Sequence, residues 1–82
     1  MKSEISELLD DSIKELNVYV DDAFISVEEG KNVFNIVLDS EVMIDLNRVT
    51  DASRIINKIM DSSKYLDDID ELNIYSKEKG EI

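Results

Sequence analysis

The sequence lacks the residue types on which most enzyme active sites depend. It contains no cysteine and no histidine, which excludes disulfides, thiolate nucleophiles, cysteine zinc sites and the usual histidine-containing triad. Acid–base chemistry would fall on carboxylates alone. Because Gly30 and Gly80 are the only glycines, neither a P-loop nor a dinucleotide fingerprint can be assembled. We therefore expect no catalytic residue, no cofactor and no metal ion.

The chain also lacks proline and any long hydrophobic run. No stretch approaches the roughly 18 apolar residues of a membrane span, and the N-terminal MKSEISELLD carries acids where a signal peptide needs an apolar core. No proline-rich or low-complexity segment indicates a linker. With 82 residues, about half of a typical domain of ~150, we expect one small cytoplasmic domain. Its size favours a binding module over an enzyme with a deep cleft.

Positive charge is scarce. Nine lysines and arginines stand against 20 aspartates and glutamates, which gives a net charge of -11 at pH 7. That potential repels nucleic-acid phosphates and anionic lipids and attracts basic partners. We expect binding neither to free nucleic acid nor to membranes, but to a basic protein, including one already seated on RNA. The alternative is that the acidity only keeps a small domain soluble.

Two stretches place apolar residues at the spacing of an amphipathic helix. Residues 3–16 form the first, with Ser3 as its predicted N-cap. The second is IDLNRVTDASRIINKIMD, in which Asp45 occupies the N-cap position of a helix that ends at Asp61. Its apolar arc comprises Val49, Ala52, Ile55, Ile56, Ile59 and Met60. We expect this arc to pack and the opposite side to face water.

Three shorter stretches have the alternation of β-strands. The first covers residues 20–27 and leads into a reversal at 29–32, where Gly30 can adopt the positive φ of a tight hairpin. The second, at 33–39, is apolar on both sides, which is typical of a strand at the sheet centre. The third is ELNIYS, residues 71–76.

The order helix, strand, strand, helix, strand predicts an α+β fold. We expect a two-layer α-β-β-α-β sandwich in which both helices cover one face of a three-stranded sheet. The domain should span residues 1–76, and the polar residues 77–82 should form a flexible tail.

The second face of this sheet would then be open, and it supplies the candidate binding residues. Alternation assigns to it Phe24, Ser26, Asn35, Val37, Asn73 and Tyr75. Such a mixed patch fits a docking surface, although the same residues would also serve as ordinary cross-strand pairs. The acidic stretch before the last strand adds Asp67, Asp68 and Asp70 as candidate partner contacts. It lacks the glycine and glutamate spacing of an EF-hand, which favours a solvated loop over a metal site.

The helical stretch also carries a family resemblance. It is similar to the N-terminal domain of the ribosome maturation factor RimP, in which a hydrophobic residue and an acidic N-cap precede a helix with a Ser-Arg-like pair and a Leu-Asp-like end. The residues in this register are Ile44, Asp45, Leu46, Asn47, Ala52, Ser53, Arg54, Ile56, Ile59, Met60 and Asp61. Upstream, ELNVYVDDAFISVEEGKN and VFNIVLD resemble the family's first two strands, and LNIYS resembles its third.

The resemblance covers nearly the whole chain but has departures. Arg48 and Val49 stand where the family has Asp-Cys, and Ser76, Lys77 and Glu78 replace its Ser-Pro-Gly turn. The family's second, barrel-like domain has no counterpart in these residues.

The resemblance implies an α-β-β-α-β fold and a non-enzymatic assembly factor. Its expected partner is the immature 30S small ribosomal subunit, reached through a basic ribosomal protein near the decoding region, and we expect a monomer. One alternative is an acidic interaction module that mimics nucleic acid and occupies a basic protein. A further one is a homodimer formed through the sheet.

Overall fold

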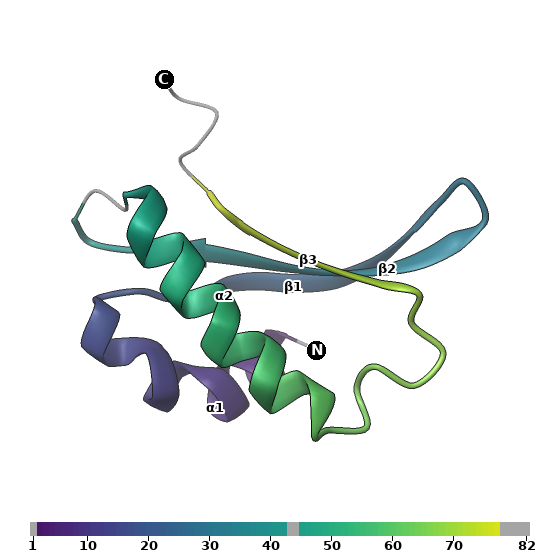
Figure 1. The fold of residues 1–82 in the computed structure, drawn as a ribbon, viewed down its shortest axis with the longest axis horizontal. Coiled ribbons are helices and arrows are strands. Elements are labelled where there is room, and N and C mark those ends of the chain that lie inside the picture. Colours follow the sequence, from purple (N-terminus) through teal and green to yellow (C-terminus); the bar gives the residue numbers. More distant parts are fainter. Residues whose placement is uncertain (1, 43–44, 78–82) are drawn as a thin grey trace.

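The computed structural model describes residues 2–42 and 45–77 and confirms the α+β fold. Helix α1 and the short 3-10 turn η1 precede a hairpin, and helix α2 connects that hairpin to a last strand (Figure 1). The elements are α1 (Lys2–Ile13), η1 (Lys14–Leu16), β1 (Tyr19–Glu28), β2 (Lys31–Asp39), α2 (Leu46–Asp61) and β3 (Glu71–Ser76).

The three strands form one sheet in the order β1-β2-β3. The prediction that the second strand is interior is thus confirmed. β1 pairs with β2 antiparallel, whereas β3 pairs with β2 parallel. Parallel neighbours need a crossover connection, and α2 provides it. Both helices lie on the same side of the sheet (Figure 1), so within residues 2–42 and 45–77 its other face has no helix over it.

The hairpin turn is tighter than the sequence predicts. β1 continues to Glu28 and β2 begins at Lys31, which pairs with Glu28 and leaves two residues in the turn. These are Glu29 and Gly30, with φ of 54° and 80°. Positive φ at both central positions is the mark of a type I′ turn, whose twist matches that of the strands. The predicted positive φ at Gly30 is confirmed.

The core lies between the helices and the sheet. Each helix buries residues four positions apart, because that spacing returns to one side of an α-helix after about one turn. The residues with no exposed surface are Ile5, Leu9 and Ile13 from α1, Phe34, Ile36 and Leu38 from β2, and Ala52, Ile56 and Met60 from α2. Two further residues of the predicted arc of α2, Ile55 and Ile59, are half-buried and pack against this cluster. Full burial of each large apolar side chain stabilises the fold by about 1.5–3 kcal/mol.

The two helix starts have different outcomes. The prediction for Asp45 is confirmed, since its carboxylate accepts a hydrogen bond of 2.8 Å from the backbone N–H of Arg48. The prediction for Ser3 is wrong, because α1 already begins at Lys2 and Ser3 lies within its first turn. At its other end α1 tightens into η1, which ends at Asn17 in the left-handed conformation with φ of 61°.

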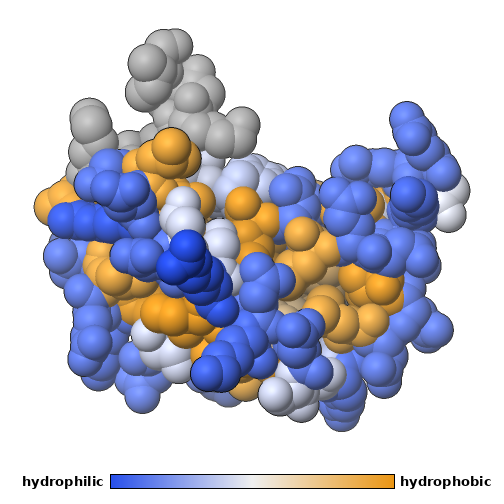
Figure 2. Space-filling view, viewed as in Figure 1, coloured by the Kyte–Doolittle hydropathy of each residue, from blue (hydrophilic) through white to orange (hydrophobic). Residues whose placement is uncertain are grey.

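The hairpin extends past the helices. Ile25 and Val27 lie on the same face as the buried Ala23, as the alternation predicts, but they are 46% and 70% exposed. The helices do not reach the turn end of the sheet (Figure 1). In the same view, Figure 2 shows hydrophobic surface between α2 and the hairpin, within a mostly hydrophilic surface.

Lys77, the residue after the last strand, makes two contacts with the rest of the sheet. Lys77 donates its backbone N–H to the carbonyl of Leu38 at 2.8 Å, and its ammonium lies 3.7 Å from a carboxylate oxygen of Asp21. Position 77 therefore joins β3 to both other strands. The remainder of the predicted tail, 78–82, lies outside the described residues.

Candidate functional site

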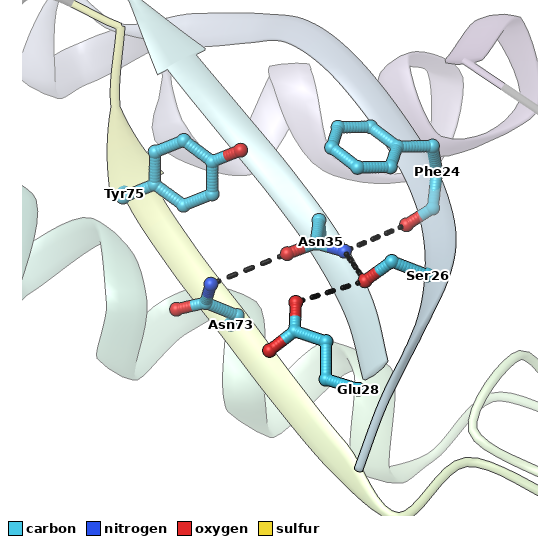
Figure 3. A pocket seen from close by; sticks show the side chains of 6 residues that line it. All are labelled: Phe24, Ser26, Glu28, Asn35, Asn73 and Tyr75. Atoms are coloured by element: carbon cyan, nitrogen blue, oxygen red, sulfur yellow. Dashed lines mark hydrogen bonds between the residues drawn. The ribbon is translucent and has the colours of Figure 1, made fainter. Parts of the chain in front are cut away.

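The candidate site is a depression on the open face of the sheet, with a volume of about 490 Å³. We call it the open-face depression. It is lined by Phe24, Ser26, Glu28, Asn35, Asn73 and Tyr75. Five of these six residues are on the open face assigned from the sequence, and Figure 3 shows how they converge from all three strands.

Strand register brings these residues together. Phe24 is the pairing partner of Asn35, which in turn pairs with Asn73 across β2 and β3. Side chains opposite one another in paired strands lie about 4.5–5.5 Å apart at Cβ, so these three form a row across the sheet. Tyr75 lies in the next row, where it pairs with Val37. In Figure 3 the rings of Phe24 and Tyr75 stand on either side of Asn35.

A chain of hydrogen bonds forms the floor of the open-face depression (Figure 3). Asn73 donates its Nδ2 to Asn35 Oδ1 at 3.2 Å, and Asn35 donates its Nδ2 to Ser26 Oγ at 2.9 Å. Ser26 then donates its hydroxyl to Glu28 Oε2 at 3.1 Å. The Asn35 amide also lies 3.3 Å and 3.4 Å from the carbonyl oxygens of Val33 and Phe24. These contacts satisfy the hydrogen-bonding groups of the buried Asn35 side-chain amide.

The centre of the open face is buried although no helix covers it. Val33, Asn35 and Val37 of β2 are only 2%, 3% and 8% exposed. Side chains of the two flanking strands cover them, as expected for a central strand with apolar residues on both faces. Val37 therefore lies beside the depression without lining it. Phe24, by contrast, keeps 39% of its surface exposed and forms one wall.

Glu28 is the lining residue that the sequence analysis misses. The predicted strand stops at Val27, one residue before Glu28, whereas β1 includes it and pairs it with Lys31. The signal was present in the alternation of Phe24, Ser26 and Glu28, because every second residue of a strand shares a face. Extending the strand by one position would have found Glu28, the one charged residue among the described residues that line the depression.

The acidic candidates Asp67, Asp68 and Asp70 lie elsewhere. They belong to the loop between α2 and β3, and none of them lines the open-face depression. Asp70 accepts a hydrogen bond of 2.8 Å from the backbone N–H of Asn32 and donates its own N–H to the Asn32 carbonyl at 2.9 Å. The Asp68 carbonyl accepts from the Asn32 side chain at 3.1 Å. This loop is thus fixed to the start of β2 at the turn end of the sheet.

The groups that line the open-face depression are of kinds that can recognise a ligand. The Ser26 hydroxyl donates to Glu28 and accepts from Asn35, so it links the floor together and is not paired with a basic nitrogen. Amides, a carboxylate and two aromatic rings can bind a polar or cationic group. Among residues 2–42 and 45–77, no cluster of three or more acidic residues has the arrangement of a metal site.

A second exposed apolar surface lies on the helical side of the hairpin, where Ile25 and Val27 are uncovered. Within residues 2–42 and 45–77, no helix is long and apolar enough to cross a membrane.

Comparison with known proteins does not identify a family. No protein-family model matches the chain, and a search of the curated proteins finds no match. The resemblance to the RimP family stays a prediction from the residue pattern.

Proposed function

We propose that this chain is a non-catalytic binding domain of a ribosome assembly factor. It associates in the cytoplasm with the immature small ribosomal subunit through a basic ribosomal protein and assists maturation of the subunit. The observation that carries the proposal is the open-face depression on a domain of net charge -11. A partly exposed aromatic wall beside satisfied amides suits protein docking, since aromatic residues are enriched where interfaces bury most surface.

The choice of partner rests on the family resemblance together with charge. The register from Asp45 to Asp61 supplies the resemblance, and the observed element order is the one it implies. An acidic domain is repelled by rRNA phosphates but attracted to the basic proteins that cover them. An acidic domain could therefore bind the small subunit through one of its basic proteins, without direct contact with rRNA.

The experiment is co-sedimentation of the whole chain with purified immature small subunits at moderate salt. The double variant Phe24→Ser/Tyr75→Glu should lose association, because it removes both rings of the open-face depression and places there a hydrated carboxylate that docking would have to desolvate. Val27→Ser is the matched control, since Val27 is 70% exposed on the opposite face. Circular dichroism checks that each variant is folded. Unchanged co-sedimentation of the folded double variant would contradict the proposal.

A second function is favoured by a separate observation. Glu4, Glu7, Asp11 and Glu15 are all exposed and follow one another at helical spacing along α1 and η1. Such a row could present carboxylates to a nucleic-acid-binding protein in place of phosphates. Under this alternative the chain would compete with DNA for a basic regulator and would not sediment with small subunits. Exchanging Glu4, Glu7 and Glu15 for glutamine would then abolish the competition.

A further inference from the structure

The open-face depression combines features that define the kind of side chain it can take. It has aromatic rings on two sides, amides on its floor and one carboxylate at its edge. We propose that it binds an arginine side chain of the partner protein, with the guanidinium between Phe24 and Tyr75 and directed toward Glu28. This inference deepens the proposed function and rests on it for the identity of the partner as a basic protein.

The hydrogen bonds in the floor end at the Glu28 carboxylate, which is the group that would attract a cationic ligand. Asn73 donates to Asn35, Asn35 donates to Ser26, and Ser26 donates to Glu28. Every donor in this chain points toward the Glu28 end, so the bond dipoles add and reinforce one another. Each N–H or O–H dipole has its positive end at the hydrogen, so the chain presents its positive end to the Glu28 carboxylate and holds that carboxylate in place. A cation placed beside Glu28 is therefore attracted by the carboxylate itself.

Glu28 is available for such a contact. Its Oε2 accepts from Ser26, and its Oε1 accepts no hydrogen bond from the part of the chain that the structure describes. Lys31 is its pairing partner in the strand register, yet Lys31 and Glu28 are not among the ion pairs within residues 2–42 and 45–77, which include Lys14 with Asp11 and Lys77 with Asp21. Among the described residues, no basic side chain lines the depression and competes for the carboxylate.

The aromatic walls favour arginine over lysine. A guanidinium is planar, weakly hydrated and able to stack on a ring while its edge donates hydrogen bonds. An ammonium is more strongly hydrated and cannot stack, so it would lose more solvation between two rings. The floor and the carboxylate provide oxygen acceptors for the N–H groups at the guanidinium edge. An anionic ligand would instead meet Glu28 and the overall charge of -11.

The test uses the whole chain and two capped tripeptides, acetyl-Gly-Arg-Gly-amide and acetyl-Gly-Lys-Gly-amide. Binding is followed by NMR through the side-chain amide signals of Asn35 and Asn73. The arginine peptide should shift both signals in a saturable manner and bind at least about threefold more tightly than the lysine peptide. Equal affinity for the two peptides, or shifts confined to other surfaces, would overturn the inference.

Two pairs of variants define the contacts. Glu28→Gln should weaken arginine binding several-fold, whereas Glu29→Gln removes the same charge from the turn, outside the depression, and should leave affinity within about twofold. Phe24→Leu keeps an apolar side chain of similar size but removes the ring, so it should reduce the preference for arginine over lysine. Equal losses in the two glutamate variants would show general charge attraction and refute a specific site.

Failure of the inference and failure of the proposed function give different results. If Glu28→Gln and Phe24→Leu both co-sediment with small subunits as the parent does, while Phe24→Ser/Tyr75→Glu does not, the docking face stands and the arginine site is refuted. If the arginine peptide binds as described but the chain does not sediment with small subunits, the site stands and the ribosomal function is refuted.

Discussion

Asn73 donates a hydrogen bond of 3.2 Å to Asn35, although 38 positions separate the two residues in the sequence. The bond joins the parallel strand β3 to the central strand β2 outside the backbone ladder. Because Asn35 is only 3% exposed, its amide depends on protein partners for its hydrogen bonds. This contact therefore contributes to the stability of the sheet as well as to the floor of the open-face depression.

Asn35→Ala should lower the free energy of unfolding by about 1–3 kcal/mol, since it removes a buried and fully bonded amide. Asn73→Ala should cost less, about 0.5–1 kcal/mol, because Asn73 is exposed and water can replace its partner. The double variant should lose less than the sum of the two, with a coupling of about 0.5–1.5 kcal/mol. Urea denaturation of all four proteins measures it, and strictly additive losses would show that the bond contributes nothing.

The start of α2 offers a test of a contact that the sequence predicts and the structure confirms. Asp45→Ala should lower the free energy of unfolding by about 1 kcal/mol, because the backbone N–H of Arg48 loses its acceptor. Asp45→Asn is the matched control: it removes the charge but keeps a side-chain oxygen for the cap. Thermal or urea unfolding should therefore rank the asparagine variant close to the parent. Equal destabilisation by both changes would assign the effect to charge.

The acidic loop before β3 separates residues that look equivalent in the sequence. Asp70→Ala should lower the free energy of unfolding by about 1–2 kcal/mol, since its carboxylate holds the backbone of Asn32. Asp67→Ala, at an exposed position, should change it by less than about 0.5 kcal/mol. Urea unfolding measures both. If the two variants were equally stable, the contact between this loop and β2 would have no energetic importance.

The same loop shows where sequence reasoning ends. Alternation in the three strands predicts that Phe24, Asn35 and Tyr75 lie on one face. Once a strand is assigned, its period of two fixes the face on which each side chain lies. The interior place of β2 followed from apolar residues on both of its sides. The contact of Asp70 with Asn32 depends on the path of the long connection between β2 and β3. A local sequence pattern does not predict that path.

Exposure at the hairpin has a similar origin. Alternation places Ile25 and Val27 on the same face as Ala23, but whether they are covered depends on how far the helices extend over the sheet. Of these three residues, Ala23, nearer the middle of β1, is the one that is buried. A β-bulge between Val20 and Asp22 also shifts the register locally, which brings both Val20 and Ala23 to the core. Bulges depend on the paired strand as much as on the bulged one.

Tyr19, the first residue of β1, should make stability sensitive to alkaline pH. Partial burial raises the pKa of the Tyr19 phenol above its ordinary value of 10.0. The carboxylates of Asp39, Asp21 and Glu41 raise this pKa further, and Lys77 lowers it. The unfolded chain therefore releases this proton at lower pH than the folded protein does. Stability linked to Tyr19 is fully present below about pH 10 and falls as pH rises through the folded pKa.

Tyr19→Phe removes the ionisable group and keeps the ring. The difference in free energy of unfolding between parent and variant should be constant below about pH 9 and should shift in favour of the variant above about pH 10, where only the parent's unfolded state gains from losing the proton. Urea unfolding across this range measures the difference, and ultraviolet absorbance of tyrosinate follows the ionisation directly. Parallel stability curves for the two proteins at all alkaline pH values would show that the folded and unfolded states release this proton at the same pH.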